Sequence, residues 1–123
     1  MTVLTTARNS FPKSHRLLKP RDFQNVFQRA RKWSTNGLTL YARPNTLGHP
    51  RLGIAISRKC SRSAVVRNRI RRVIRESFRM CQDQLGGFDL VFLGRAGLER
   101  LERRELRGMV NKNLMELRRC ERP

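Results

Sequence analysis

The sequence predicts one α/β (α+β) domain, a two-layer sandwich in which about three helices pack on a small mixed sheet. The length of 123 residues suits a single domain. Three segments of helical length carry apolar residues at helical spacing, and a strand, a helix and a strand follow one another between residues 51 and 93. This order indicates neighbouring parallel strands. We expect residues 13–119 to form the domain, residues 1–12 a flexible basic tail, and residues 120–123 a second tail.

The first helix is expected over residues 20–31. Pro20 suits a first helical turn, where its missing N–H group needs no partner, and Asp22 favours the positive end of a helix. Four residues then recur at helical spacing, namely Phe23, Val26, Phe27 and Ala30. Residues 33–37 are expected to end this helix.

Two strands are expected next, over residues 38–43 and 51–57, with a loop at residues 44–50 between them. Side chains alternate in character along both segments, and Tyr41 falls on the polar side of the first. In the second, Gly53, Ala55 and Ser57 form a face of small groups. That face could accept a closely packed element or a ligand.

The second half of the chain contains a predicted helix at 62–82, a strand at 88–93 and a helix at 98–119. The strand is almost continuously apolar, as expected of a strand covered on both faces. The helix at 62–82 has an apolar stripe made of Val66, Ile70, Val73, Ile74, Ser77 and Cys81, with Phe78 at its margin. Arg67 and Arg69 flank the stripe, and the opposite side carries Asn68, Arg71, Arg72, Arg75 and Arg79.

The charge distribution indicates a polyanionic partner. The net charge is +19, and Asp22 is the only acidic residue before Glu76. Arginine outnumbers lysine by 23 to 5, and arginine binds phosphate through two parallel hydrogen bonds and stacks on bases. This composition favours a folded RNA as the partner.

The sequence lacks the groups that a catalytic site made of protein would need. The basic part has no carboxylate cluster for metal ions and no histidine pair for acid–base chemistry. Cys60, Cys81 and Cys120 lack zinc-site spacing and are expected as thiols in a reducing cytosol. His15 and His49 are expected at the surface without partners. No apolar run is long enough to span a membrane as a helix.

The helix at 62–82 has side chains that suit the binding of phosphates better than catalysis. Arg71 and Arg75 lie one turn apart, roughly 5–6 Å, which is close to the spacing of successive phosphates. Asn68 could bond a base, a sugar or a neighbouring backbone group, or have a local capping or packing role. Glu76 is placed either to pair with Arg72 or to reduce the charge at the end of the helix.

Aromatic residues form a second candidate site beside the basic helix. Phe23, Phe27 and Tyr41 could stack on unpaired bases. Two phenylalanines at this helical spacing more often belong to a hydrophobic core.

These motifs resemble those of the bacterial ribonuclease P protein subunit. Residues 64–79, AVVRNRIRRVIRESFR, are similar to the signature of that family, in which Arg-Asn-Arg is followed by an apolar residue, two bases and an Arg-Glu pair. Residues 51–59, 17–27 and 88–95 resemble its strand with paired bases, its opening helix and its last strand. The resemblance covers residues 13–118. It departs from many members at Cys60-Ser61-Arg62-Ser63, where those members have a glycine.

The resemblance implies a ribonucleoprotein mechanism. An RNA subunit would be the catalyst, and Mg²⁺ bound mainly by that RNA would assist the cut that removes the 5′ leader of precursor tRNA. The protein would bind no cofactor alone, would join the ribonuclease P RNA at 1:1 in the cytoplasm, and would also contact precursor tRNA. The family fold has a left-handed strand–helix–strand crossover and is shared with a domain of a small-subunit ribosomal protein.

The motif positions also imply two groups of contact residues. The catalytic RNA would contact Arg58, Lys59, Arg62, Arg67, Arg69, Arg72 and Arg79. The leader would lie in a cleft lined by Phe23, Phe27, Tyr41, Asn68, Arg71 and Arg75. Apart from the resemblance, composition alone would fit a structural RNA binder of the ribosomal-protein kind. A self-sufficient nuclease and a membrane-active basic helix fit less well.

Overall fold

The computed structural model describes residues 13–121, so the predicted tail at 1–12 and the last two residues lie outside the described part of the chain. The elements are the 3₁₀ turns η1 (Lys13–His15), η2 (Gln82–Gln84) and η3 (Leu98–Arg100), the helices α2 (Pro20–Arg29), α3 (Ala64–Cys81) and α4 (Arg103–Glu121), and the strands β1 (Arg31–Thr35), β2 (Leu38–Pro44), β3 (Arg51–Ala55) and β4 (Phe88–Gly94). Among these residues, no helix has the length and apolar character needed to cross a membrane.

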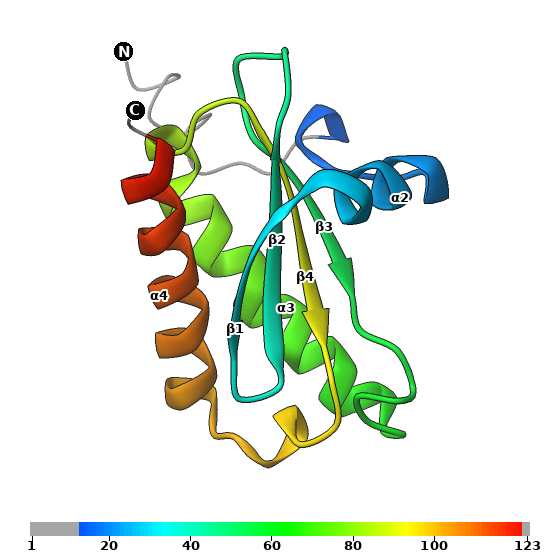
Figure 1. Ribbon diagram of the computed structural model, residues 1–123. Helices are drawn as coiled ribbons and strands as arrows, with labels where there is room; N and C mark the ends of the chain where they lie inside the picture. The colour runs from blue at the N-terminus through cyan, green and yellow to red at the C-terminus, as the bar shows by residue number, and fades with distance from the viewer. Residues whose placement is uncertain (1–12, 122–123) are drawn as a thin grey trace.

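The four strands form one mixed sheet in the order β1-β2-β4-β3. β2 is antiparallel to both β1 and β4, whereas β3 and β4 are parallel neighbours joined through α3. In the view of Figure 1 both parallel strands point downward, β4 lies to the left of β3, and α3 returns behind the sheet. This crossover is therefore left-handed, against the usual rule and as the family resemblance implied.

Helices cover the two faces of the sheet unequally. α3 and α4 lie side by side on one face, where Leu40, Leu90 and Phe92 of the sheet are completely buried. α2 packs across one end of the other face, where Val26 and Val91 form a smaller apolar cluster with Leu17. The predicted two-layer α+β arrangement is confirmed. So is the prediction that the strand at 88–93 is covered on both faces, because Leu90 and Val91 point to opposite sides and are equally buried.

The expectation that residues 33–37 only end a helix was wrong, because β1 begins at Arg31 and forms a hairpin with β2. Thr35 pairs with Leu38, so the turn consists of Asn36 and Gly37, and both have positive φ (34° and 92°). A two-residue Asn-Gly turn of this kind is the strongest short-range hairpin signal in a sequence. That signal was present, but β1 is short and carries four polar residues out of five, so its alternation is weak.

Other element boundaries differ in small but informative ways. The last helix begins at Arg103 and not at residue 98, because Leu98–Arg100 forms a separate 3₁₀ turn preceded by Gly97 at φ 101°. α4 continues to Glu121, into the segment expected as a tail. β3 ends at Ala55, because the chain turns there toward the basic loop that precedes α3.

One ion pair fixes the end of the sheet where β3 and β4 begin. Arg51 donates two hydrogen bonds to the carboxylate of Asp89, at 2.8 and 2.7 Å, and the side-chain amide of Asn45 donates a third at 2.9 Å. Burial alone would raise the pKa of Asp89, but the hydrogen bonds from Arg51 and Asn45 outweigh it and hold the pKa below its ordinary value.

The histidines expected to have no partners lie together near this end of the sheet. The rings of His15 and His49 stack with centroids 4.4 Å apart, and Nδ1 of His15 is 3.0 Å from Oε1 of Gln82. Both side chains are half-buried. The stack therefore joins η1 to the loop between β2 and β3, which no sequence spacing would have shown.

Replacing Asp89 by Asn should lower the free energy of unfolding at neutral pH by about 1–2 kcal/mol, the low end for charge-assisted hydrogen bonds because Arg51 is partly exposed. A depressed pKa gives stability that is present above the ordinary carboxyl pKa and is lost as pH falls through the folded value. The difference between wild type and D89N should therefore shrink below about pH 4, as measured by urea unfolding. Glu102→Gln, which changes an exposed carboxylate, is the control and should lower the unfolding free energy at neutral pH less than D89N does.

Candidate nucleic-acid interface

The orientation of α3 is set by its apolar stripe. Ile70, Val73, Ile74 and Phe78 are completely buried against the sheet and α4, whereas Val66 and Cys81 at the two ends are half-buried. Phe78, placed at the margin of the stripe by its spacing, is thus a full member of the core. The N-terminus of α3 is capped by Ser63, whose Oγ accepts a hydrogen bond from the backbone N–H of Val66 at 3.2 Å. The remaining faces of the helix carry the charged residues.

The loop before α3 presents three cations around an open pocket of about 560 Å³. Its backbone is shaped by serines: Oγ of Ser57 accepts from the N–H of Lys59, and Oγ of Ser61 accepts from the N–H of Ser63, each at 3.2 Å. The exposed residues that line this pocket are the cations Arg58, Lys59 and Arg62, together with Ser63 and the acidic Glu99 of η3. The sequence did not predict that these serine side chains would shape the loop, although serines between basic residues are typical of turns in which a side chain bonds the backbone two residues later.

Cys60 lies in the same loop but points into the core. It is 1% exposed, and burial raises the pKa of its thiol. Cys81 is half-buried, and burial likewise raises the pKa of its thiol to about 11. Both behave as small apolar residues, and the side chain of Cys120 lies outside the described part of the structure.

Two arginines of α3 are held in place by backbone carbonyls. The guanidinium of Arg67 donates to the carbonyl oxygens of Ser61 and Arg62, both at 3.0 Å. Arg71 donates to the carbonyl oxygen of Ile56 at 2.8 Å, beyond the end of β3. These bonds order the side chains without neutralising their charge, which reduces the entropy lost when an anion binds.

Asn68 is exposed, and its Oδ1 accepts a hydrogen bond from Arg71 at 3.0 Å. It does not cap the helix, since Ser63 has that role. With its carbonyl oxygen occupied, Asn68 presents its NH₂ group to solvent as a hydrogen-bond donor.

Arg67 and Arg69 lie on opposite flanks of α3, because residues two apart in a helix are about 200° apart around its axis. Arg67 faces the basic loop, whereas Arg69 lies on the flank nearer η3 and α4. Nε of Arg69 is buried and has no hydrogen-bond partner among the described residues. The predicted catalytic-RNA residues on α3 therefore do not form one face of the helix.

Arg72, Arg75 and Arg79 form the exposed outer row of α3. No described carboxylate forms an ion pair with them. In particular, Glu76 does not pair with Arg72. Its carboxylate lies 3.4 Å from Nη2 of Arg107 on α4. The row is therefore an array of unneutralised guanidinium groups at one-turn spacing.

The three predicted aromatic residues lie together on the sheet face that α2 partly covers. The rings of Phe27 and Tyr41 meet edge to face with centroids 4.9 Å apart, and Phe27 is 40% exposed. Phe23 is half-buried and packs directly on Gly53, where an added Cβ would lie 2.7 Å from the ring. The small-residue face of β3 thus accepts an aromatic ring from α2, as the sequence suggested.

The aromatic cluster and the basic helix adjoin through β3. Ala55 packs with Tyr41 and Phe23 in one cluster, and the next residue along the chain, Ile56, is the acceptor for Arg71. On the α2 side, Nη1 of Arg43 donates to the carbonyl oxygen of Asn25 at 2.9 Å and ties the helix to β2. Aromatic faces for bases and cations for phosphates therefore border one surface.

The described part of the chain shows no metal-ligand cluster beside this surface. Within residues 13–121, the histidine, cysteine and carboxylate side chains form no group of three able to hold a metal ion. The surface has the cations and aromatic rings that suit a strand of nucleic acid.

Known proteins are similar to this chain in sequence and in fold. The family description "Ribonuclease P" matches residues 11–118. The chain belongs to the bacterial ribonuclease P protein family. The ribonuclease P protein component of Methylococcus capsulatus is 56% identical over 85 residues, which cover 69% of this chain and 66% of that protein. The corresponding protein of Pseudoalteromonas atlantica is 43% identical, with 92% and 95% covered.

Solved structures of the family have the same fold. The ribonuclease P protein of Staphylococcus aureus matches with a TM-score of 0.79 at 27% identity, over 85% of this chain and 95% of that one. The Thermotoga maritima protein matches with a TM-score of 0.67 at 30% identity, over 83% and 93%. Family membership and the sequence-based fold prediction are thus confirmed.

Replacing Gly53 by Ala should push Phe23 and α2 away from the sheet, because the new methyl group would overlap the ring. We expect a loss of about 1–3 kcal/mol of unfolding free energy, the usual range for overpacking. Gly108→Ala is the matched control: its Cβ would meet nothing within 4 Å, and alanine should stabilise α4 by about 0.5–1 kcal/mol. Equal stability of the two variants in urea unfolding would contradict the packing assigned to Phe23.

Proposed function

We propose that this chain is the protein subunit that binds ribonuclease P RNA and the 5′ leader of precursor tRNA, and thereby assists removal of the leader. Family membership supports its place as a protein component of that endoribonuclease. The observation that carries the finer proposal is the set of unneutralised arginines on α3, two of which are held by backbone carbonyls, with Arg71 next to the aromatic surface. Such a pairing suits phosphates together with unpaired bases.

The catalytic RNA is proposed to bind the basic loop and the arginines of α3, through Arg58, Lys59, Arg62, Arg67, Arg69, Arg72 and Arg79. Because Arg67 and Arg69 occupy opposite flanks of α3, RNA contacting both would have to wrap around the N-terminal half of the helix. A surface of this kind reads the shape and backbone of a folded RNA more than its sequence.

The leader is proposed to lie across the sheet face next to α2. Phe27 and Tyr41 offer ring edges and faces for unpaired bases, and Phe23 supports them from below. The NH₂ group of Asn68 and the nearby cations would contact phosphates or base edges, through Asn68, Arg71 and Arg75. Since the leader is single-stranded, stacking gives affinity with little dependence on its sequence.

The chemical step is proposed to belong to the RNA subunit with its Mg²⁺, in a 1:1 complex in the cytoplasm. The protein would act by positioning the precursor and by supplying positive charge. Its cations offset the repulsion between two polyanions, so that catalytic RNA and precursor associate at lower Mg²⁺ concentration.

Reconstitution tests this proposal. Wild-type protein should restore cleavage of precursor tRNA by a bacterial ribonuclease P RNA at low Mg²⁺, and protein alone should cleave nothing. Failure to restore cleavage would favour a purely structural RNA binder.

Arg72→Ala should weaken binding to the catalytic RNA and lower the slope of log affinity against log salt by about one. Lys112→Ala, an exposed cation of α4, removes the same charge and should leave the slope nearly unchanged.

Tyr41→Ala should weaken binding of precursor tRNA by the reconstituted enzyme by about fivefold or more, the lower end of a base-stacking contribution. Binding of mature tRNA, which lacks the leader, should change little. Filter binding or anisotropy measures both affinities, and circular dichroism checks the fold. Equal losses for the two ligands would remove Tyr41 from the leader site.

A further inference from the structure

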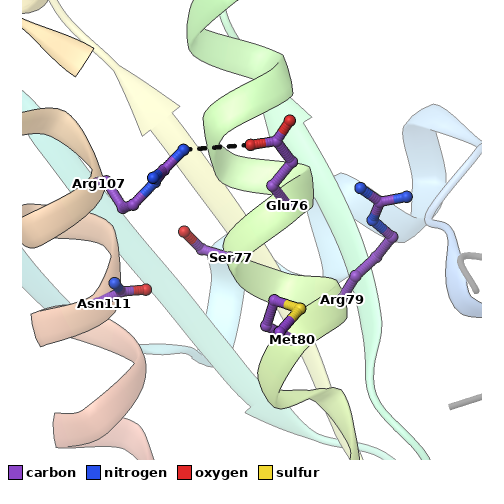
Figure 2. A pocket seen from close by; sticks show the side chains of 6 residues that line it. All are labelled: Glu76, Ser77, Arg79, Met80, Arg107 and Asn111. Carbon is purple, nitrogen blue, oxygen red and sulfur yellow. Dashed lines mark hydrogen bonds and ion pairs between the residues drawn. The ribbon is translucent and has the colours of Figure 1, made fainter. Parts of the chain in front are cut away.

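A groove of about 500 Å³ lies between α3 and α4, and it shares only Arg79 with the surfaces proposed above. Its lining residues are Glu76, Ser77, Arg79, Met80, Arg107 and Asn111. Figure 2 shows the ion pair of Glu76 and Arg107 across one end, Met80 toward the other, and Ser77 and Asn111 between them. The volume falls in the range of pockets that hold small ligands, so a single nucleotide can be accommodated.

Met80 gives the groove an apolar contact surface. Met80 is 73% exposed and lies outside the buried apolar stripe of α3. A single exposed apolar residue is ordinary on a protein surface. Here, however, the flexible and polarisable thioether lies within a concave site that also contains polar groups, and such a side chain packs well against a flat aromatic ring.

Asn111 supplies both a donor and an acceptor in the same groove. Its side chain is exposed on α4, points toward α3, and has no hydrogen-bond partner among the described residues. A side-chain amide can match the paired donor and acceptor on the edge of a base. Met80 and Asn111 together therefore offer one group for the face of a base and one for its edge.

Two cations border these groups. Arg107 is held only by its 3.4 Å contact with Glu76, and both side chains are substantially exposed, so a phosphate can compete for the guanidinium. Arg79 points away from α4, along the outer surface of α3. Arg75 and Arg72 lie one and two turns back along that surface. The row of phosphate-binding groups on α3 therefore leads to the rim of the groove.

The positive charge of the protein and of the groove favours one of the possible occupants of the groove. A second copy of the chain is disfavoured, because two molecules of net charge +19 repel each other. An acidic peptide could meet the same cations, but RNA is favoured because the groove continues the surface proposed to bind RNA and also presents an amide suited to a base edge. RNA satisfies both the row and the amide.

We propose that the groove between α3 and α4 binds one unpaired nucleotide of an RNA partner. The base packs on Met80 with its edge at Asn111, and the flanking phosphates lie near Arg79 and Arg107. This inference rests on the proposed function and extends the RNA-binding surface around α3 to its α4 side. The nucleotide comes either from the catalytic RNA or from the precursor, and the two sources are separable by experiment.

Affinity measurements with paired variants test the site. Met80→Ala is compared with Met115→Ala, an exposed methionine of α4 that does not line the groove, and Arg107→Ala with Lys112→Ala. All four side chains are exposed, so the variants should fold. The groove variants should bind about fivefold more weakly or worse, and the controls should stay within about twofold of wild type. Weaker binding to ribonuclease P RNA alone identifies the catalytic RNA as the source, and weaker binding of precursor to the assembled enzyme identifies the substrate.

Crosslinking locates the nucleotide. A photoreactive amino acid at position 111 in the reconstituted holoenzyme should crosslink to one discrete RNA position, whereas the same group at position 112 should not. Groove variants that bind like their controls, in a holoenzyme that still cleaves precursor tRNA, would overturn this inference and leave the proposed function intact. Crosslinks from position 111 to protein, and not to RNA, would also overturn it and indicate a peptide partner.

Discussion

The docking of α3 on the sheet is the constraint on which the rest of the structure depends. One helix has to bury Ile70, Val73, Ile74 and Phe78 completely and also expose a row of arginines. The apolar contact fixes the rotation of the helix, and that rotation decides which guanidinium groups face the loop, the solvent or α4. A shift of one residue in the stripe would turn the row toward the sheet. Binding geometry in this protein is thus a consequence of core packing.

Sequence periodicity predicted what depends on local repeats, which includes α2, α3, β2 and β4 and the small-residue face containing Gly53. It did not predict features made by distant segments. β1 was missed because an exposed edge strand needs no regular apolar face. The pairing of Glu76 with Arg107, in place of Arg72, depends on the approach of α4, and the stack of His15 on His49 depends on a loop 34 residues later in the chain. The handedness of the crossover came from family resemblance alone.

Charge is distributed so that the fold and the binding surface interfere little with each other. The well-buried carboxylate, Asp89, is matched by Arg51 and Asn45 at one end of the sheet. The arginines of α3 and the basic loop are left without acidic partners in the described residues. Their mutual repulsion opposes folding, and an RNA partner would relieve it. Stability of the free protein should therefore respond to multivalent anions more strongly than the size of its core suggests.

The two edge strands of the sheet, β3 and β1, differ in whether a neighbouring segment pairs with their outer backbone groups. At β3, the backbone N–H of Leu17 donates to the carbonyl oxygen of Leu52 at 2.9 Å, so the preceding segment covers that side. At β1, the outer edge has no neighbouring strand among the described residues, and the strand begins with Arg31 and Lys32. An open strand is a template for association with other chains, and adjacent positive charges discourage it. The positive charge proposed to suit RNA would thus also discourage edge-to-edge association of the free protein at β1.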